Sequence, residues 1–261
     1  MAKTIGILLC DETYGEDSVG KFYIDLFKKN EVENWEYFKV VSGNVPDLNS
    51  IHNYIGFILT GSCWSANDQA KWILDLVEFI NHIIQCQQKS NNAPKLFGFC
   101  FGHQLICKVL GARVVKNDVG RFIISETDIK VFNYLQNKEF YKRVFHDKKY
   151  IRVVKLHEEE VIDLPPNAVL LGSSEYCKNE VVSFGDKILS MQGHMDISEE
   201  DLLGTYLTTL KDLGKINEAD ETILINSINE KSNDCSNVIE MTYMNKRPLT
   251  TFIDKFRMSI L

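Results

Sequence analysis

The sequence predicts an α/β fold of three layers, in which helices cover both faces of an open, mostly parallel sheet. Three observations support this prediction. The first third of the chain alternates short apolar runs with longer amphipathic stretches, which is typical of β-α-β units. Residues 112–132 and 150–192 contain short β-branched runs broken by turns, which favours an additional small antiparallel section. The composition is that of a globular protein, with 44% hydrophobic and 25% charged residues among 261.

The first elements can be placed along the chain in order. Strands are expected at 4–9, 37–41, 54–59 and 95–99, and helices at 20–29, 70–87 and 102–110. The helix at 70–87 has the clearest pattern, because its apolar residues recur at intervals of three and four and form one face. These residues are Trp72, Ile73, Leu76, Val77, Ile80, Ile83 and Ile84. Gly111 is expected in the C-cap role after the helix at 102–110.

The C-terminal part is predicted to be helical. A helix is expected at 198–213, with Ser198 as its N-cap and acidic residues in its first turn. The tail is predicted to form two more helices around a polar break at 231–237, with Pro248 opening the last one. We therefore expect one domain over 1–214 and a C-terminal helical extension over 215–261 that packs on it.

The charge balance argues against two kinds of partner. The chain has 29 Lys and Arg against 36 Asp and Glu, a net charge of −7. This argues against nucleic acid and against an anionic membrane surface, and it favours a small-molecule substrate.

No run of eighteen apolar residues is present, and the apolar run at 5–10 is too short for a signal peptide. The seven cysteines form no C-x-x-C pair, which favours a reducing, cytoplasmic location.

The most informative motif surrounds Cys100. A predicted strand ends at Phe99 and a helix begins by Gly102, so Cys100 lies in the tight turn between them. Gly98 and Gly102, two residues to each side, remove Cβ atoms that would collide in such a turn. A thiol at a helix N-terminus feels the positive end of the helix dipole, which favours a reactive thiolate. The alternative is a buried structural cysteine between packing glycines.

Two backbone segments could stabilise an oxyanion beside this thiol. The N–H of Phe101 points outward from the turn. The loop at Gly61 and Ser62 follows the third predicted strand, and parallel topology places it at the same carboxyl edge of the sheet as Cys100. This loop is a candidate for the second N–H donor, although an ordinary strand-to-helix turn would have the same composition.

A nucleophilic cysteine needs a base, and the chain offers six histidines. His194 is the best candidate, because it follows the strand at 188–191 and Asp196 could orient its ring. His103 is expected to have a packing or hydrogen-bonding role beside the turn. His157 either lines the pocket or lies on the surface beside an acidic run. The other three, His52, His82 and His146, are expected to be solvated or structural.

These motifs occur in an order and at spacings that resemble class I glutamine amidotransferase domains. The resemblance rests on 98–104, on the loop at 59–62, on 156–161 and on Gln192-Gly193-His194. Within that family the chain looks most like the stand-alone γ-glutamyl peptidases, and it is similar to the glutaminase portion of guanosine monophosphate synthetase. The tail resembles the C-terminal helices of those peptidases more loosely. The resemblance implies a flavodoxin-like sheet.

The resemblance also implies a chemistry. Cys100 would attack the γ-carbonyl of a small γ-glutamyl amide, such as glutathione or one of its conjugates, and His194 would hold the proton with Asp196 as the acid. Backbone N–H groups of Phe101 and of Gly61 or Ser62 would bind the oxyanion. The remaining substrate contacts would come from Gln104, which shapes the glutamyl pocket, and from His157. A glutamyl thioester would then be hydrolysed, without a metal or organic cofactor.

One departure from the family pattern concerns the acid. The family usually has His-Pro-Glu where this chain has His194-Met195-Asp196. Aspartate is one methylene shorter than glutamate, so we expect a longer contact with the imidazole unless the backbone shifts. Two alternatives to a γ-glutamyl peptidase therefore stay open. One is a glutaminase that supplies ammonia to a separate synthase, and the other is a binding or regulatory module with a decayed triad.

Overall fold

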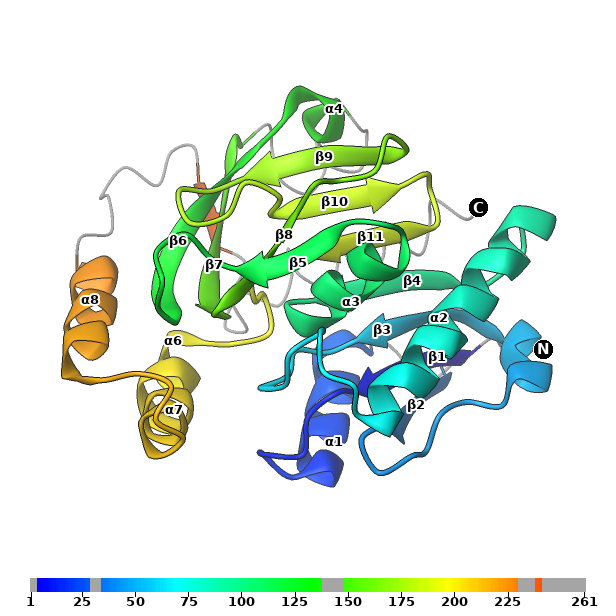
Figure 1. Ribbon diagram of the computed structural model, residues 1–261, viewed down its shortest axis with the longest axis horizontal. Coiled ribbons are helices and arrows are strands. Elements are labelled where there is room, and N and C mark those ends of the chain that lie inside the picture. The colour runs from blue at the N-terminus through cyan, green and yellow to red at the C-terminus, as the bar shows by residue number, and fades with distance from the viewer. Residues whose placement is uncertain (1–3, 29–33, 138–147, 230–237, 241–261) are drawn as a thin grey trace.

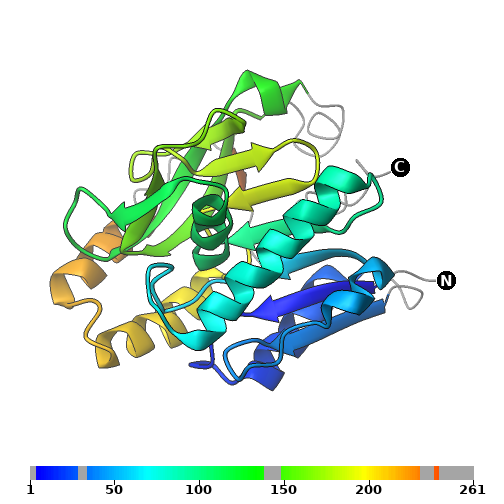
Figure 2. The same ribbon diagram turned by 45° about the vertical axis from the view of Figure 1, so that its right-hand side comes forward.

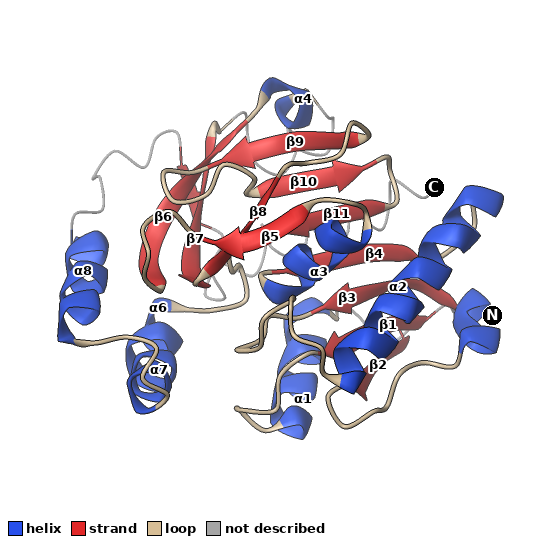
Figure 3. Ribbon diagram, in the orientation of Figure 1, coloured by secondary structure: helices blue, strands red, loops and turns tan. Residues whose placement is uncertain are grey.

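The computed structural model describes residues 4–28, 34–137, 148–229 and 238–240, and a large mixed sheet runs through it (Figures 1 and 3). Among these residues, ten strands form this sheet in the order β12-β7-β6-β9-β10-β11-β4-β3-β1-β2. The strands are β1 (Thr4–Leu9), β2 (Asn34–Lys39), β3 (Tyr54–Leu59), β4 (Lys95–Phe99), β6 (Ile123–Val131), β7 (Tyr150–His157), β9 (Ala168–Ser173), β10 (Val181–Phe184), β11 (Ile188–Met191) and β12 (Val238–Glu240). A separate antiparallel pair consists of β5 (Arg113–Lys116) and β8 (Glu159–Ile162).

Helices connect these strands and cover the sheet. They are α1 (Glu16–Phe27), the 3₁₀-helix η1 (Leu48–Asn53), α2 (Lys71–Lys89), α3 (Phe101–Val109), α4 (Asn133–Gln136), α6 (Glu199–Asp201), the π-helix η2 (Leu202–Tyr206), α7 (Leu207–Asp212) and α8 (Glu218–Asn229). The helix predicted at 198–213 is present as α6, η2 and α7 in series. As predicted, Ser198 is its N-cap, since its Oγ accepts the N–H of Asp201 at 3.0 Å. Among the described helices, none has the length and apolar character needed to cross a membrane.

Five neighbouring strands make up the parallel half of the sheet. Strands β2, β1, β3, β4 and β11 pair in parallel in that order. Four of them, β1, β3, β4 and β11, have the bounds that the sequence predicts. Because parallel strands leave the sheet at the same edge, the segments after β1, β3, β4 and β11 all begin at one edge of the molecule. Gly61 lies just past β3, Cys100 directly follows β4, and His194 lies just past β11.

The side chains of β1 show how the three layers are built. Ile5, Ile7 and Leu9 point to one face of the sheet and pack with Tyr23, Leu26 and Phe27 of α1. Leu8 points to the other face, where α2 and α3 bury their apolar sides. Figures 1 and 2 show α2 and α3 in front of the sheet, with α1 behind it. The predicted three-layer α/β/α arrangement with a flavodoxin-like parallel core is therefore confirmed.

The other half of the sheet is mainly antiparallel and carries the C-terminal helices, while β12 at its edge pairs in parallel with β7. Strands β10, β9, β6 and β7 continue from β11 with antiparallel pairing. Leu207, Leu210 and Leu224 of α7 and α8 form a third apolar cluster with Ile124 and Val154 of β6 and β7. The described part of the C-terminal extension thus packs on the antiparallel half, on the left in Figure 1.

Three elements of the structure differ from the prediction. Helix α1 begins at Glu16, four residues before the expected start, and Glu16 and Asp17 place negative charge in its first turn. The strand expected at 37–41 is β2, which begins at Asn34 because its first residue pairs with Thr4 of β1. Residues 238–240, for which the sequence predicts no element, form β12 beside β7. The predicted second tail helix, which Pro248 opens, lies outside the described residues.

Candidate active site

Cys100 occupies a sharp turn between β4 and α3. Its φ of +45° and ψ of −104° lie in a region that residues with a Cβ rarely adopt. The flanking glycines make the turn possible. A Cβ on Gly98 would lie 2.5 Å from the carbonyl carbon of Gly102, and a Cβ on Gly102 would lie 2.6 Å from the carbonyl oxygen of Leu59. The predicted strand–cysteine–helix turn is therefore present, and it requires both glycines.

The neighbouring strands hold this strained turn in place. The N–H of Cys100 donates to the carbonyl of Met191 at 2.9 Å, and the N–H of Gly102 donates to the carbonyl of Thr60 at 3.2 Å. These bonds tie the turn to the ends of β11 and β3. Phe101 is the first residue of α3, where an N–H has no acceptor within the helix. Its N–H is thus available beside the thiol.

His194 follows β11 and is clamped by β7. Its N–H donates to the carbonyl of Val154 at 2.8 Å, and the N–H of Val154 donates back to the carbonyl of His194 at 3.1 Å. Gly193 allows this close approach, because a Cβ there would lie 2.5 Å from Cγ2 of Val153. The histidine therefore has a fixed backbone position.

Asp196 contacts the imidazole at an ordinary hydrogen-bond distance. Its Oδ1 lies 3.0 Å from Nδ1 of His194. The longer contact that we expect from the shorter side chain without a backbone shift is therefore not present. Met195, which stands where the resembled family has proline, is fully buried in the apolar core that contains Met191. Burial of this side chain fixes the turn in place of a proline ring.

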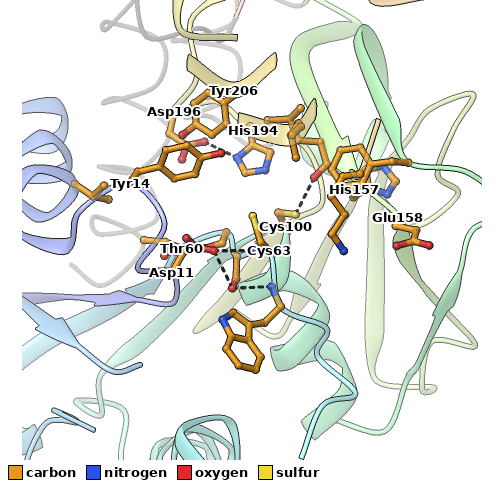
Figure 4. A pocket seen from close by; sticks show the side chains of 18 of the residues that line it. Asp11, Tyr14, Thr60, Cys63, Cys100, His157, Glu158, His194, Asp196 and Tyr206 are labelled. Atoms are coloured by element: carbon orange, nitrogen blue, oxygen red, sulfur yellow. Dashed lines mark hydrogen bonds and ion pairs between the residues drawn. The ribbon is translucent and has the colours of Figure 1, made fainter. Parts of the chain in front are cut away.

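Electrostatics favour a charged histidine. Burial opposes the imidazolium, but the charge of Asp196 and the hydrogen bonds to Asp196 and Cys100 outweigh it and raise the pKa of His194 to about 10. Burial likewise opposes the Asp196 carboxylate, yet the nearby His194 charge and hydrogen bond lower the pKa of that carboxyl. The pair is therefore an ion pair at neutral pH. Figure 4 shows the imidazole between Asp196 and the thiol of Cys100.

The loop after β3 approaches both His194 and Cys100. A Cβ on Gly61 would lie 2.8 Å from Cε1 of His194 and 3.6 Å from Cβ of Cys100. Asp11 holds this loop, because its Oδ2 accepts the N–H of Cys63 at 2.7 Å and the hydroxyl of Ser62 at 3.3 Å. Sequence reasoning missed Asp11, although its position just past β1 at the carboxyl edge is a signal for it.

A cavity of about 420 Å³ lies in front of the thiol. Every predicted site residue except Phe101 lines it: Cys100, His194, Asp196, Gly61, Ser62, Gln104 and His157. The cavity also reaches residues that the sequence did not single out, among them Tyr14, Phe22, Tyr23, Glu159, Thr205 and Tyr206. One site is thus enclosed by α1, by the C-terminal helices and by the loops after β1 and β3. Figure 4 shows its labelled side chains.

Gln104 and His157 line this cavity through contacts with β8. Nε2 of Gln104 donates to the carbonyl of Glu159 at 2.8 Å and to Oε1 of Gln192 at 3.2 Å. Nδ1 of His157 lies 3.1 Å from the same carbonyl. Burial lowers the pKa of His157 well below its usual range, so the ring is neutral and Nδ1 carries the hydrogen. Both side chains therefore help to fix the wall of the cavity.

The other histidines lie elsewhere, whereas Cys63 also lines the cavity. His103 is buried, with Nδ1 2.8 Å from Oγ of Ser190, and burial lowers its pKa to about 3, in keeping with the predicted packing role. His52 and His82 do not line the cavity, and His146 lies outside the described residues. The cysteines that the structure describes are free thiols. Within these same ranges, no three His, Cys, Asp or Glu side chains gather to hold a metal ion.

Comparison with known proteins places this chain in a family. The sequence profile described as glutamine amidotransferase class-I matches residues 27–202. The chain is 31% identical over 197 residues to γ-glutamyl peptidase 3 of Arabidopsis thaliana, an overlap of 73% of this chain and 75% of the relative. It is 31% identical over 120 residues to one subunit of the glutamine-hydrolysing GMP synthase of Pyrococcus abyssi, covering 44% of this chain and 59% of that relative.

A solved structure shares the fold of this chain. A glutamine amidotransferase of Thermotoga maritima superposes with a TM-score of 0.72 at 18% identity, over 98% of this chain and 99% of that one. This likeness concerns the path of the backbone, and the sequence match covers more than half of the chain. The chain therefore belongs to the class I glutamine amidotransferase family.

Proposed function

We propose that this chain is a cysteine-dependent hydrolase that cleaves γ-glutamyl amide bonds of peptides. The observation that carries the proposal is the convergence of a strained cysteine, a charged histidine and a glycine loop on one cavity. Each group has a role in acyl transfer: the thiol as nucleophile, the imidazole as proton carrier and the backbone N–H groups as oxyanion donors.

Acylation would begin with attack of the Cys100 thiolate on the γ-carbonyl carbon. The new carbon–sulfur bond shifts the carbonyl electrons onto oxygen, and the N–H groups of Phe101 and of Gly61 or Ser62 stabilise the resulting negative charge. The carbon–nitrogen bond then breaks as His194 donates its proton to the leaving amine. Asp196 keeps the ring oriented and stabilises the imidazolium before this transfer.

Deacylation would use the same groups with water as the nucleophile. Neutral His194 takes a proton from a water molecule, and the water oxygen attacks the carbonyl carbon of the glutamyl thioester on Cys100. Collapse of the second oxyanion releases glutamate and returns the sulfur as a thiolate beside the imidazolium. No step requires a further reactant.

The apolar lining of the cavity favours a leaving group larger than ammonia. Apolar side chains from four segments line it, namely Val19, Phe22, Phe122, Leu156 and Leu210. The ammonia of glutamine needs no such surface, whereas the amine part of a γ-glutamyl peptide would bury apolar atoms there. The names of the Arabidopsis relatives agree with this preference.

The experiment is a panel of γ-glutamyl compounds with the purified chain alone. We expect glutamate release from γ-glutamyl dipeptides to exceed release from glutamine, and Cys100→Ala to abolish it. Cys86→Ala is the matched control, because Cys86 is on α2 and does not line the cavity. Feeble release from every compound that rises when a synthase is added would instead establish the glutaminase alternative. An intact fold whose Cys100 resists a thiol-directed glutamine analogue would establish the binding module.

A further inference from the structure

We infer that Tyr23 is a positioning residue for Asp196, the acidic member of the triad, and that it compensates for the short side chain of this aspartate. The Tyr23 hydroxyl donates a hydrogen bond to Oδ2 of Asp196, while Oδ1 faces Nδ1 of His194 at 3.0 Å. The two carboxylate oxygens are thus engaged from opposite sides. This inference rests on the proposed function, because it assigns Tyr23 a role in that reaction.

The position of Tyr23 is fixed by its own packing. It lies on α1 with 5% of its surface exposed, and its ring stacks on Phe27 with centroids 5.9 Å apart. Phe27 in turn stacks on Phe99, with centroids 6.4 Å apart, and Phe99 directly precedes Cys100. A stacked aromatic column therefore joins the tyrosine to the strand that carries the nucleophile.

Helix α1 is itself held close to the sheet. Gly20 lies against the ring of Tyr37 on β2, where a Cβ would come within 2.5 Å of Cγ. This close packing leaves α1 little freedom to move away from the sheet. The Tyr23 hydroxyl is thus presented to Asp196 by a rigid element rather than by a loop.

Burial makes the hydrogen bond from Tyr23 important for Asp196. Asp196 is 4% exposed, and a buried carboxylate is costly unless each oxygen has a partner. With a single methylene, Asp196 can also swing about its χ1 bond, which would turn Oδ1 away from the imidazole. A hydrogen bond from Tyr23 to the second oxygen fixes the plane of the carboxylate and so the direction of the bond to His194.

The groups that face Asp196 are few and come from three segments. His194 lies on the same segment, Tyr23 comes from α1, and Tyr206 from η2 also interacts electrostatically with the carboxylate. The bond from Tyr23 lowers the pKa of Asp196, because it stabilises the charged form. Loss of the hydroxyl should therefore let Asp196 take up a proton at a higher pH.

The test compares Tyr23→Phe with Tyr54→Phe. The Tyr54 hydroxyl also bonds a carboxylate, Oε2 of Glu36 at 2.8 Å, but outside the cavity, so Tyr54→Phe controls for the loss of such a bond. For Tyr23→Phe we expect kcat on a γ-glutamyl dipeptide to fall about ten-fold, the effect of one hydrogen bond to a charged group, with KM little changed. The acid limb of the kcat profile should move to higher pH, and Tyr54→Phe should leave both quantities unchanged.

Two further measurements distinguish a failure of this inference from a failure of the proposed function. The loss of kcat in Tyr23→Phe should shrink in the Asp196→Glu background, because the longer acid no longer presents the same oxygen to Tyr23. If the wild type releases no glutamate, the proposed function fails, and the nitrogen NMR signals of His194 then report on Asp196. Tyr23→Phe must still move the low-pH transition of those signals upward. An unchanged transition, or an unchanged acid limb in an active enzyme, would overturn the inference.

Discussion

The turn around Cys100 and the turn from Gly193 to Asp196 supply the two halves of the site by different means. At Cys100, backbone atoms approach so closely that two side chains must be absent, since a Cβ on Gly98 or Gly102 would meet backbone at 2.5 to 2.6 Å. At Asp196, side chains determine the geometry, through the bonds to His194 and Tyr23. The first turn should therefore tolerate almost no substitution, whereas the second already departs from the family pattern and keeps its contact.

The largest effect should come from Gly102→Ala. The added methyl group would lie 2.6 Å from both Cβ and the carbonyl oxygen of Leu59, and backbone there cannot move without breaking β3 from its neighbours. We expect a loss of about 3 kcal/mol in the free energy of unfolding and no measurable glutamate release. Chemical denaturation measures the first quantity. Gly204→Ala is the control, because nothing lies within 4 Å of its Cβ position, and a stable, active Gly102→Ala would contradict the backbone argument.

Asp196→Asn should have the next largest effect, because it removes the charge that stabilises the imidazolium. By analogy with a general triad, we expect kcat to fall by about 10³- to 10⁴-fold. His194 should also lose its proton at a lower pH, since the Asp196 charge is the main influence that raises its pKa to about 10. The alkaline limb of the residual activity should move toward neutral pH. An unmoved limb would show that another group holds that proton.

The same substitution should change how stability depends on pH. With a folded pKa of about 10 against an ordinary value of 6.5, His194 binds a proton in the folded state that the unfolded chain lacks between these pH values. Stability from this group is therefore present below pH 6.5 and is lost as pH rises toward 10. Thermal unfolding across this window should show a steeper fall for wild type than for Asp196→Asn. Equal slopes would contradict the ion pair.

Gly193→Ala would test whether the second turn also depends on backbone approach. The added methyl group would lie 2.5 Å from Cγ2 of Val153, a side-chain atom rather than backbone. We expect a loss of about 1 to 3 kcal/mol in the free energy of unfolding, with reduced activity because His194 shifts. Val153→Ala in the same chain should restore much of the activity by removing the obstructing atom. Failure of this rescue would indicate that backbone strain dominates here as well.

The contrast between the two turns also explains what the sequence could predict. Gly98, Cys100 and Gly102 are neighbours in the chain, so their spacing between a predicted strand and a predicted helix indicated a strained turn at Cys100, with a buried structural cysteine as the alternative. Gly61 and His194 could be added because parallel topology places strand ends at one edge. Tyr23 carried no such signal, because a tyrosine on the buried face of an amphipathic helix is read as core. Its contact with Asp196 spans 173 positions and depends on how α1 packs.

The fold shows the same division between local and distant information. Strands β1, β3 and β4 were predicted with the right bounds because each is a short apolar run between turn residues. The starts of α1 and β2 were misplaced because polar residues occupy their first turn and first pairing positions. The strand at Val238–Glu240 was missed because three residues become a strand only by pairing with β7. Such pairing is a property of the folded sheet and leaves no local pattern.

The smallest effect should be that of Asp196→Glu, which restores the acid usual in the family. The shorter acid would limit turnover only if its contact with His194 were long, and that contact is 3.0 Å. The extra methylene must also fit between His194 and Tyr23 in a buried space. We therefore expect kcat to stay within about three-fold of wild type or to fall, consistent with the small cost of well-tolerated changes in packed sites. A clear rise in kcat would show that the Tyr23 contact does not compensate for the missing methylene. The departure of the second turn from the family pattern would then lower the activity of the site.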